Sequence, residues 1–247
     1  MQAILYVSHG SRNREAISEA IACIAKVKRL VNVELQEICF LELAEPNLSQ
    51  GIESLVTQGA TRISIVPVLL LSAGHYYTDI PEEINRARAI HKTITFTYGK
   101  PLGVQKRFAA ILTERIEEVY TSNHSHAKVL LVGRGSRNPQ TMLDIEEIGN
   151  ALQEKVDMPV EACYLAVCEP SFHEAIESSL KEGYQKIIVV PYLWFTGVLM
   201  RFLEKEINNL PGNSTDVLLC RQLGDHPYMV DALKERAYEA VISNYQI

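Results

Sequence analysis

Three side chains that are good ligands for a divalent metal each follow a short apolar run of the sequence: His9, Glu42 and His75. Two imidazole nitrogens and a carboxylate oxygen suit ferrous iron, cobalt, nickel or zinc, and a set of three leaves coordination positions open for a substrate. If the apolar runs are parallel strands, their carboxyl ends meet at one edge of a sheet. The sequence therefore predicts a metal site on these three residues, which are also the candidate catalytic residues.

The chain repeats its own sequence pattern, and the second copy lacks all three candidate ligands. Residues 5–13 match residues 130–138 at six of nine positions. The residues aligned with the candidate ligands are Arg134, Ala166 and Leu199. A histidine needed only for the fold would be expected in both copies, so this difference favours a functional role. The alternative is structural: a capped histidine at a strand end, and a histidine and a glutamate exposed to water.

Short apolar runs alternate with helical patterns, which predicts an α/β fold of two homologous lobes, each a parallel sheet flanked by helices. In the first lobe we expect strands near residues 2–8, 33–40, 62–70 and 94–98, and helices near residues 14–30, 47–58, 80–91 and 104–120. The second lobe should repeat this plan. Pro67 and Pro191 indicate a strand end or an irregularity in the third strand of each lobe.

The polar segment at residues 121–126 has no periodicity and predicts a linker. We therefore expect an N-terminal lobe, residues 1–123, that contains the metal site, and a C-terminal lobe, residues 124–247, that lacks the metal ligands. The linker contains a His-x-His pair, His124 and His126. That pair either binds a metal or belongs to a solvated linker, since no third ligand is near in sequence.

The composition argues against several classes of protein. The formal net charge of −6 is unfavourable for binding duplex nucleic acid or an anionic membrane, because both need a basic surface. The longest apolar stretch, residues 66–71, is far shorter than the roughly 20 residues that cross a bilayer. No signal-peptide pattern follows Met1 and the five cysteines include no C-x-x-C pair, so we expect a cytoplasmic protein.

Four segments together resemble the sirohydrochlorin chelatases, the class II chelatases that include SirB and CbiX. These segments are residues 4–12 (ILYVSHGSR), 64–75 (SIVPVLLLSAGH), 79–83 (DIPEE) and 98–103 (YGKPLG). The resemblance covers essentially the whole chain and implies two chelatase-like lobes that face each other across a cleft. It also implies that the family's active-site histidines are His9 and His75 and that its metal-site glutamate is Glu42.

The resemblance implies a lyase that inserts a divalent metal into sirohydrochlorin, with iron or cobalt as a substrate and no permanently bound cofactor. Long cobalt chelatases of the family often end in a His-rich stretch and a Cys-rich metal motif, and this chain ends in Tyr245-Gln-Ile247 with neither. That difference favours the ferrochelatase of siroheme biosynthesis over the cobaltochelatase of anaerobic cobalamin biosynthesis. The sequence leaves open whether the chain is a monomer or a homodimer.

Sirohydrochlorin has eight carboxylates, so an acidic protein that binds it needs local groups that attract anions. Two Gly-Ser-Arg segments precede expected helices, whose N-termini favour negative charge. The predicted carboxylate-binding residues are Ser11, Arg12, Arg134, Ser136 and Arg137. A structural salt bridge is the alternative for Arg12 and Arg137. Four apolar side chains are candidates for packing on the macrocycle or in the core: Tyr76, Trp194, Phe195 and Met200.

Two other functions are compatible with parts of the pattern. A histidine phosphatase also has a His-Gly pair after its first strand, but it places an arginine directly before the histidine, where this chain has Ser8. A non-catalytic two-lobed protein that closes on a small ligand or stores metal would share the lobes. Such a protein would not need two histidines directed at a common atom, and turnover of sirohydrochlorin separates the two classes.

Overall fold

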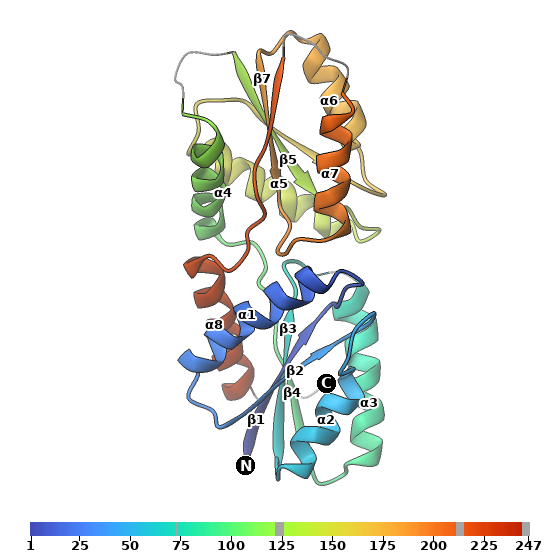
Figure 1. Ribbon diagram of the computed structural model, residues 1–247. Helices are drawn as coiled ribbons and strands as arrows, with labels where there is room; N and C mark the ends of the chain where they lie inside the picture. Colours follow the sequence, from blue (N-terminus) through green and yellow to red (C-terminus); the bar gives the residue numbers. More distant parts are fainter. Residues whose placement is uncertain (73, 122–125, 211–214, 244–247) are drawn as a thin grey trace. The chain divides into compact units, whose positions relative to one another are not determined.

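The computed structural model describes residues 1–72, 74–121, 126–210 and 215–243. The chain divides into two compact units, the first made of residues 1–103 and 227–247 and the second of residues 104–226. Each unit contains a four-stranded parallel sheet with helices on both faces, as the ribbon shows (Figure 1). The predicted α/β class with two homologous lobes is confirmed.

The sheet of the first unit has the strand order β2-β1-β3-β4. Its strands are β1 (Gln2–Ser8), β2 (Leu35–Phe40), β3 (Arg62–Val68) and β4 (Thr95–Tyr98). Helices α1 (Arg14–Leu30) and α8 (Pro227–Ile242) pack together on one face, and α2 (Leu48–Thr57) and α3 (Ile80–Ile90) cover the other (Figure 1). Because both faces are covered, β1 and β3 are buried along almost their whole length.

The sheet of the second unit repeats this topology in the order β6-β5-β7-β8. Its strands are β5 (Ala127–Gly133), β6 (Val160–Tyr164), β7 (Lys186–Pro191) and β8 (Asp216–Leu219). Helices α4 (Lys106–Val119) and α5 (Gln140–Gln153) contact each other on one side, and α6 (Phe172–Lys181) and α7 (Val198–Asn208) pack on the other (Figure 1).

The two sequence repeats exchange their last helices, which corrects the predicted domain boundary. The boundary was expected between residues 123 and 124, which lie outside the described residues. Helix α4 ends the first repeat but belongs to the second unit, and α8 ends the second repeat but belongs to the first. The division into residues 1–123 and 124–247 therefore separates the repeats and not the compact units.

Each exchanged helix is fixed in its unit by one arginine that donates to two backbone carbonyls. On α4, the buried Arg115 donates from Nε to the carbonyl of Gln222 and from Nη2 to that of Leu223, both at 3.1 Å. On α8, Arg236 donates to the carbonyls of residues 101 and 102 at 2.8 and 2.9 Å. Amphipathic periodicity shows that a helix buries one face but not which sheet covers that face, so the exchange was not predictable from the pattern.

Local sequence signals explain where the helices and strands begin and end. Asn47 caps α2 in a reciprocal pair of hydrogen bonds with Gln50, and Ser171 and Glu174 do the same for α6. Pro67 is the penultimate residue of β3 and Pro191 the last of β7, so both prolines stand at a strand end as predicted.

Several other expectations concern residues far from the sheet edges. His126 stacks on Tyr184 with ring centroids 4.4 Å apart, whereas its predicted partner His124 lies outside the described residues. All five cysteines are free and buried. Across the described ranges, no helix combines the length and apolar character needed to cross a membrane.

Candidate metal site

The loops that follow β1, β2 and β3 bring His9, Glu42 and His75 together at the carboxyl edge of the first sheet. His9 follows β1 directly, Glu42 lies in the loop after β2, and His75 begins a π-helical turn, η1 (His75–Asp79), after β3. Because β1 lies between β2 and β3, the three loops are neighbours. One ligand atom from each residue lies within 4.8 Å of the others. The predicted juxtaposition is therefore found.

Two of the distances within this triad are those expected between ligands of a single metal ion. The Nε2 atoms of His9 and His75 are 3.1 Å apart, and Nε2 of His9 is 3.5 Å from Oε1 of Glu42. Ligands bound about 2.0–2.2 Å from a metal lie about 3–3.5 Å from one another. The two imidazole rings meet edge to face, with centroids 4.6 Å apart and an interplanar angle of 87°.

Both histidines direct Nδ1 at a hydrogen-bond acceptor and Nε2 at each other. Nδ1 of His9 is 3.2 Å from the carbonyl oxygen of Gly10, and Nδ1 of His75 is 2.5 Å from Oδ2 of Asp79. In a neutral imidazole that donates from Nδ1, the Nε2 atom presents a lone pair. Two such lone pairs 3.1 Å apart repel each other unless a cation lies between them. The arrangement is thus complementary to a metal ion or a proton.

The triad is partly open to solvent, so its ligand atoms are accessible from outside. The exposed fractions of the side chains are 34% for His9, 48% for Glu42 and 27% for His75. A metal held by three such groups keeps coordination positions on its open side. The triad differs in this respect from a closed structural site, which surrounds the ion with four protein ligands.

Gly10 fixes the distance between the loops that present His9 and Glu42. Its φ is +89°, and a Cβ atom at this position would lie 1.8 Å from the carbonyl oxygen of Glu42. The backbone N–H of Glu42 in turn donates to the carbonyl of His9 at 3.1 Å. Only glycine permits this close approach of the two backbones. The sequence HG after β1 is therefore a geometric requirement of the site.

The turn that presents His75 is held by β4. Tyr98 donates its hydroxyl to the carbonyl of Tyr76 at 2.9 Å, and the two rings stack with centroids 5.0 Å apart. Burial raises the pKa of the Tyr98 phenol, so it stays protonated and can donate. Tyr76, a candidate for packing on the macrocycle, is thus engaged with Tyr98.

Sequence reasoning missed the roles of Asp79 and Tyr98. The i,i+4 spacing of His75 and Asp79 is a signal that could have identified the pair, provided that the segment between them was taken as helical. Tyr98 follows an ordinary strand pattern, and nothing in its spacing pointed to a contact with η1.

The second unit lacks the three candidate ligands at the aligned positions, all of which lie in the described residues. Arg134, Ala166 and Leu199 stand at the aligned positions. A Cβ atom on Gly135, with φ +83°, would lie 1.8 Å from the carbonyl oxygen of Ala166, which matches the geometry at Gly10. Met200 belongs to the core of this unit, and the buried Trp194 stacks on Phe195 with ring centroids 5.2 Å apart.

The Gly-Ser-Arg segments form equivalent turns before α1 and α5. The hydroxyls of Ser11 and Ser136 accept hydrogen bonds from the backbone N–H groups of the following asparagines at 3.0 and 3.1 Å. Arg12, Arg134 and Arg137 are exposed. Among the described residues, no ion pair involves Arg12 or Arg137. The salt-bridge alternative for these arginines is therefore not found.

Comparison with known proteins agrees with this geometry. The CbiX family model matches residues 3–119 and again residues 128–240. The sirohydrochlorin ferrochelatase of Priestia megaterium is 41% identical over 237 residues, which cover 96% of this chain and 89% of the relative. The sirohydrochlorin cobaltochelatase of Priestia megaterium is 34% identical over 247 residues, which cover 98% of this chain and 80% of the relative.

A solved structure of SirB from Bacillus subtilis with Fe3+ has the same two-lobed fold. The TM-score is 0.86 and the sequences are 39% identical, and the match covers 98% of this chain and 96% of that chain. The chain therefore belongs to the CbiX family, the sirohydrochlorin chelatases that its motifs resemble.

Proposed function

We propose that the chain is a sirohydrochlorin ferrochelatase, which inserts ferrous iron into sirohydrochlorin at a site formed by His9, Glu42 and His75. The observation that supports this most strongly is the pair of Nε2 atoms 3.1 Å apart, each with its Nδ1 directed at an acceptor. The identity of 41% with a ferrochelatase, compared with 34% with a cobaltochelatase, favours iron.

Metal insertion requires that the ion exchange its ligands and that the macrocycle lose two pyrrole protons. The triad supplies three ligands, so ring nitrogens can enter on the open side while the protein still holds the ion. Glu42 lowers the net charge of the site and attracts the divalent ion, which helps to hold it there until ring nitrogens replace the protein ligands. Iron and cobalt are substrates in this scheme and no resident cofactor is needed.

The two imidazoles also provide a destination for the two protons. As the metal moves from protein to ring, each Nε2 lone pair becomes vacant close to where the pyrrole protons are released. A neutral imidazole whose Nε2 lone pair is free is an effective proton acceptor. The products are then the metallated ring and two protonated imidazoles, which release their protons to water. Atoms and charge balance without a further reagent.

We extend the proposal to the carboxylates of sirohydrochlorin. Exposed arginines without an ion pair suit this role, because guanidinium groups bind carboxylates in bidentate fashion. The proposed groups are Ser11, Arg12, Arg134, Ser136 and Arg137. Arg12→Ala and Arg137→Ala should raise KM for sirohydrochlorin. The affinity for Co2+, measured without sirohydrochlorin, should not change. An unchanged KM in both variants would remove these residues from the substrate site.

The cytoplasm is the proposed location. Five free, buried cysteines are compatible with a reducing compartment, in which ferrous iron also persists.

The test is anaerobic absorbance spectroscopy of sirohydrochlorin with ferrous iron or Co2+, for the wild type, His9→Ala and His75→Ala. His91→Ala is a matched control, because His91 pairs with Glu53 at 3.0 Å outside the triad. We expect at least 100-fold acceleration over buffer for the wild type and the control, lost in both site variants. If the wild-type protein inserts metal no faster than buffer does, the enzyme proposal is wrong and the alternative of a non-catalytic binding protein stands.

The same measurement compares the two metals. Faster insertion of iron supports siroheme supply, whereas faster insertion of cobalt supports the second candidate, a cobaltochelatase of cobalamin biosynthesis, which the relative at 34% identity favours.

A further inference from the structure

We propose that Asp79 is a positioning residue, which holds the His75 ring with Nε2 directed at the metal; this rests on the metal site of the proposed function. Oδ2 of Asp79 is 2.5 Å from Nδ1 of His75, across one π-helical turn. A carboxylate bonded to the far nitrogen of a ligand histidine fixes both the tautomer and the orientation of the ring. Asp79 would therefore decide which nitrogen of His75 meets the metal.

Asp79 acts through His75 and not as a ligand of its own. The cluster of possible ligand atoms among the described residues consists of His9, Glu42 and His75, and it does not include the Asp79 carboxylate. Because Nδ1 of His75 lies between them, the carboxylate is one ring removed from the metal position. A direct contact with the metal would require the loss of this hydrogen bond.

The two histidines differ in how firmly their rings are held. Nδ1 of His9 faces the backbone carbonyl of Gly10, an acceptor that no side-chain substitution removes. The corresponding acceptor for His75 is a side chain on an exposed turn, with 54% of Asp79 accessible to solvent. Without Asp79, rotation of the His75 ring by about 180° about χ2 costs little, since χ2 of histidine is broad and roughly two-fold, and it places Cε1 where Nε2 meets the metal.

The second unit lacks both the ligand and the carboxylate. Residue 69 bonds to residue 102, and residue 193 bonds to residue 223, which aligns the two loops. In this alignment Leu199 replaces His75 and the fully buried Leu203 replaces Asp79. The fold therefore does not need a carboxylate at this position, and its presence follows that of the histidine.

The test is Co2+ binding to the complete chain, followed by the visible d–d absorption of the bound ion, with sirohydrochlorin absent. We expect Asp79→Ala to weaken Co2+ binding 10- to 100-fold and to alter the spectrum. Asp79→Asn keeps an oxygen that accepts from Nδ1–H, so it should recover to within about 5-fold of wild type. Glu53→Ala is the matched control, because it removes a carboxylate from His91 outside the site.

A double variant separates positioning from a general structural effect. In the His75→Ala background, Asp79→Ala should cause no further loss of Co2+ affinity, because the residue acts only through His75. Wild-type affinity and spectrum in Asp79→Ala, an Asp79→Asn variant as weak as Asp79→Ala, or additive losses in the double variant would each overturn the proposal. Binding of Co2+ by the wild type without insertion would refute the proposed enzyme but not the role of Asp79.

Discussion

At the carboxyl edges of the two parallel sheets, the loops after the first and second strands have the same shape and different chemistry. In both, a glycine at positive φ approaches a carbonyl of the next loop, Gly10 at Glu42 and Gly135 at Ala166. Both loops also contain a non-glycine residue at positive φ. Within the described residues, a cluster of two imidazoles and a carboxylate is found at the first edge, whereas the aligned positions of the second hold Arg134, Ala166 and Leu199. The comparison teaches that the loop geometry belongs to the fold, whereas the identity of a few side chains gives the edge its chemistry.

The largest expected effect comes from Gly10→Ala, because the new Cβ overlaps the carbonyl oxygen of Glu42 and the φ of +89° is strained for alanine. We expect a loss of about 3–5 kcal/mol of stability and complete loss of Co2+ binding. Gly135→Ala meets the same overlap at Ala166. It should lose similar stability and keep Co2+ affinity. Urea unfolding and Co2+ titration test both, and loss of Co2+ binding in both variants would contradict separate roles for the two edges.

The exchanged helices allow a second comparison between the units. The side chain of Arg115 is only 3% exposed. Arg115→Ala removes the donor to two carbonyls of the second unit and also removes a partner of Glu118. We expect the free energy of unfolding to fall by about 2–4 kcal/mol, because buried carbonyls lose a charged donor.

The control is Arg236→Ala, whose side chain is 20% exposed, so water can replace part of what is lost. Arg236→Ala should lower the free energy of unfolding by about half as much as Arg115→Ala does. Urea unfolding followed by circular dichroism measures both, and a cost for Arg236→Ala equal to or larger than that for Arg115→Ala would contradict this ranking.

The difference between the two edges can also be tested by introducing the three ligands into the second unit. The combination of Arg134→His, Ala166→Glu and Leu199→His places three ligands at the aligned positions, the third of them in the α-helix α7 and not in a π-helical turn. We expect a second Co2+ to bind, at least 10-fold more weakly than the first, because Leu203 stands where Asp79 would orient the new histidine. Equilibrium titration gives the stoichiometry, and the same triple variant in a His9→Ala chain isolates the new site. Binding of one Co2+ per chain would show that side-chain identity alone does not make the site.

The sequence was sufficient to predict most of the fold and the juxtaposition of the three candidate ligands, because hydrophobic periodicity and strand ends can be recognised in a single sequence. The predicted helix at residues 14–30 coincides with α1. His9, Glu42 and His75 were predicted to lie close together because each follows a parallel strand, and their ligand atoms do lie close together. The contact of Asp79 with His75 depends on a π-helical turn, which has no hydrophobic periodicity to reveal it. In the sequence, Arg115 resembles a surface cation of an amphipathic helix, so its burial in the second unit could not be predicted from the pattern.

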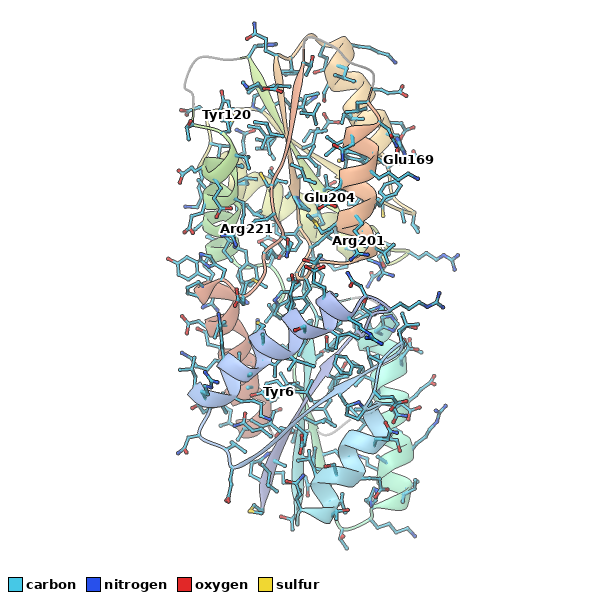
Figure 2. The ribbon with its side chains drawn as sticks, in the orientation of Figure 1. Tyr6, Tyr120, Glu169, Arg201, Glu204 and Arg221 are labelled. Atoms are coloured by element: carbon cyan, nitrogen blue, oxygen red, sulfur yellow. The ribbon has the colours of Figure 1, made fainter. Side chains whose placement is uncertain are left out.

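The smallest effect tests how firmly α4 is attached in the second unit. Glu118 accepts from Arg221, which lies beside α4 (Figure 2), and from Arg115. The hydrogen bond from Arg221, followed by the positive charges of Arg115 and Arg221, lowers the pKa of Glu118 from 4.5 to about 2. A folded-state pKa below the unfolded value stabilises the protein above the unfolded pKa, and this contribution is lost as the pH falls from 4.5 toward 2.

We therefore expect Glu118→Gln to cost about 1 kcal/mol at pH 7, a value reduced for the partial exposure of the pair, and progressively less below the unfolded pKa. Glu239→Gln is the control on α8, because Glu239 pairs with the single arginine Arg236 and should contribute less. Urea unfolding at neutral and at acidic pH gives the difference between each variant and the wild type. A cost of Glu118→Gln that stays constant as the pH falls through this window would show that the carboxylate stabilises α4 by packing and not by its charge.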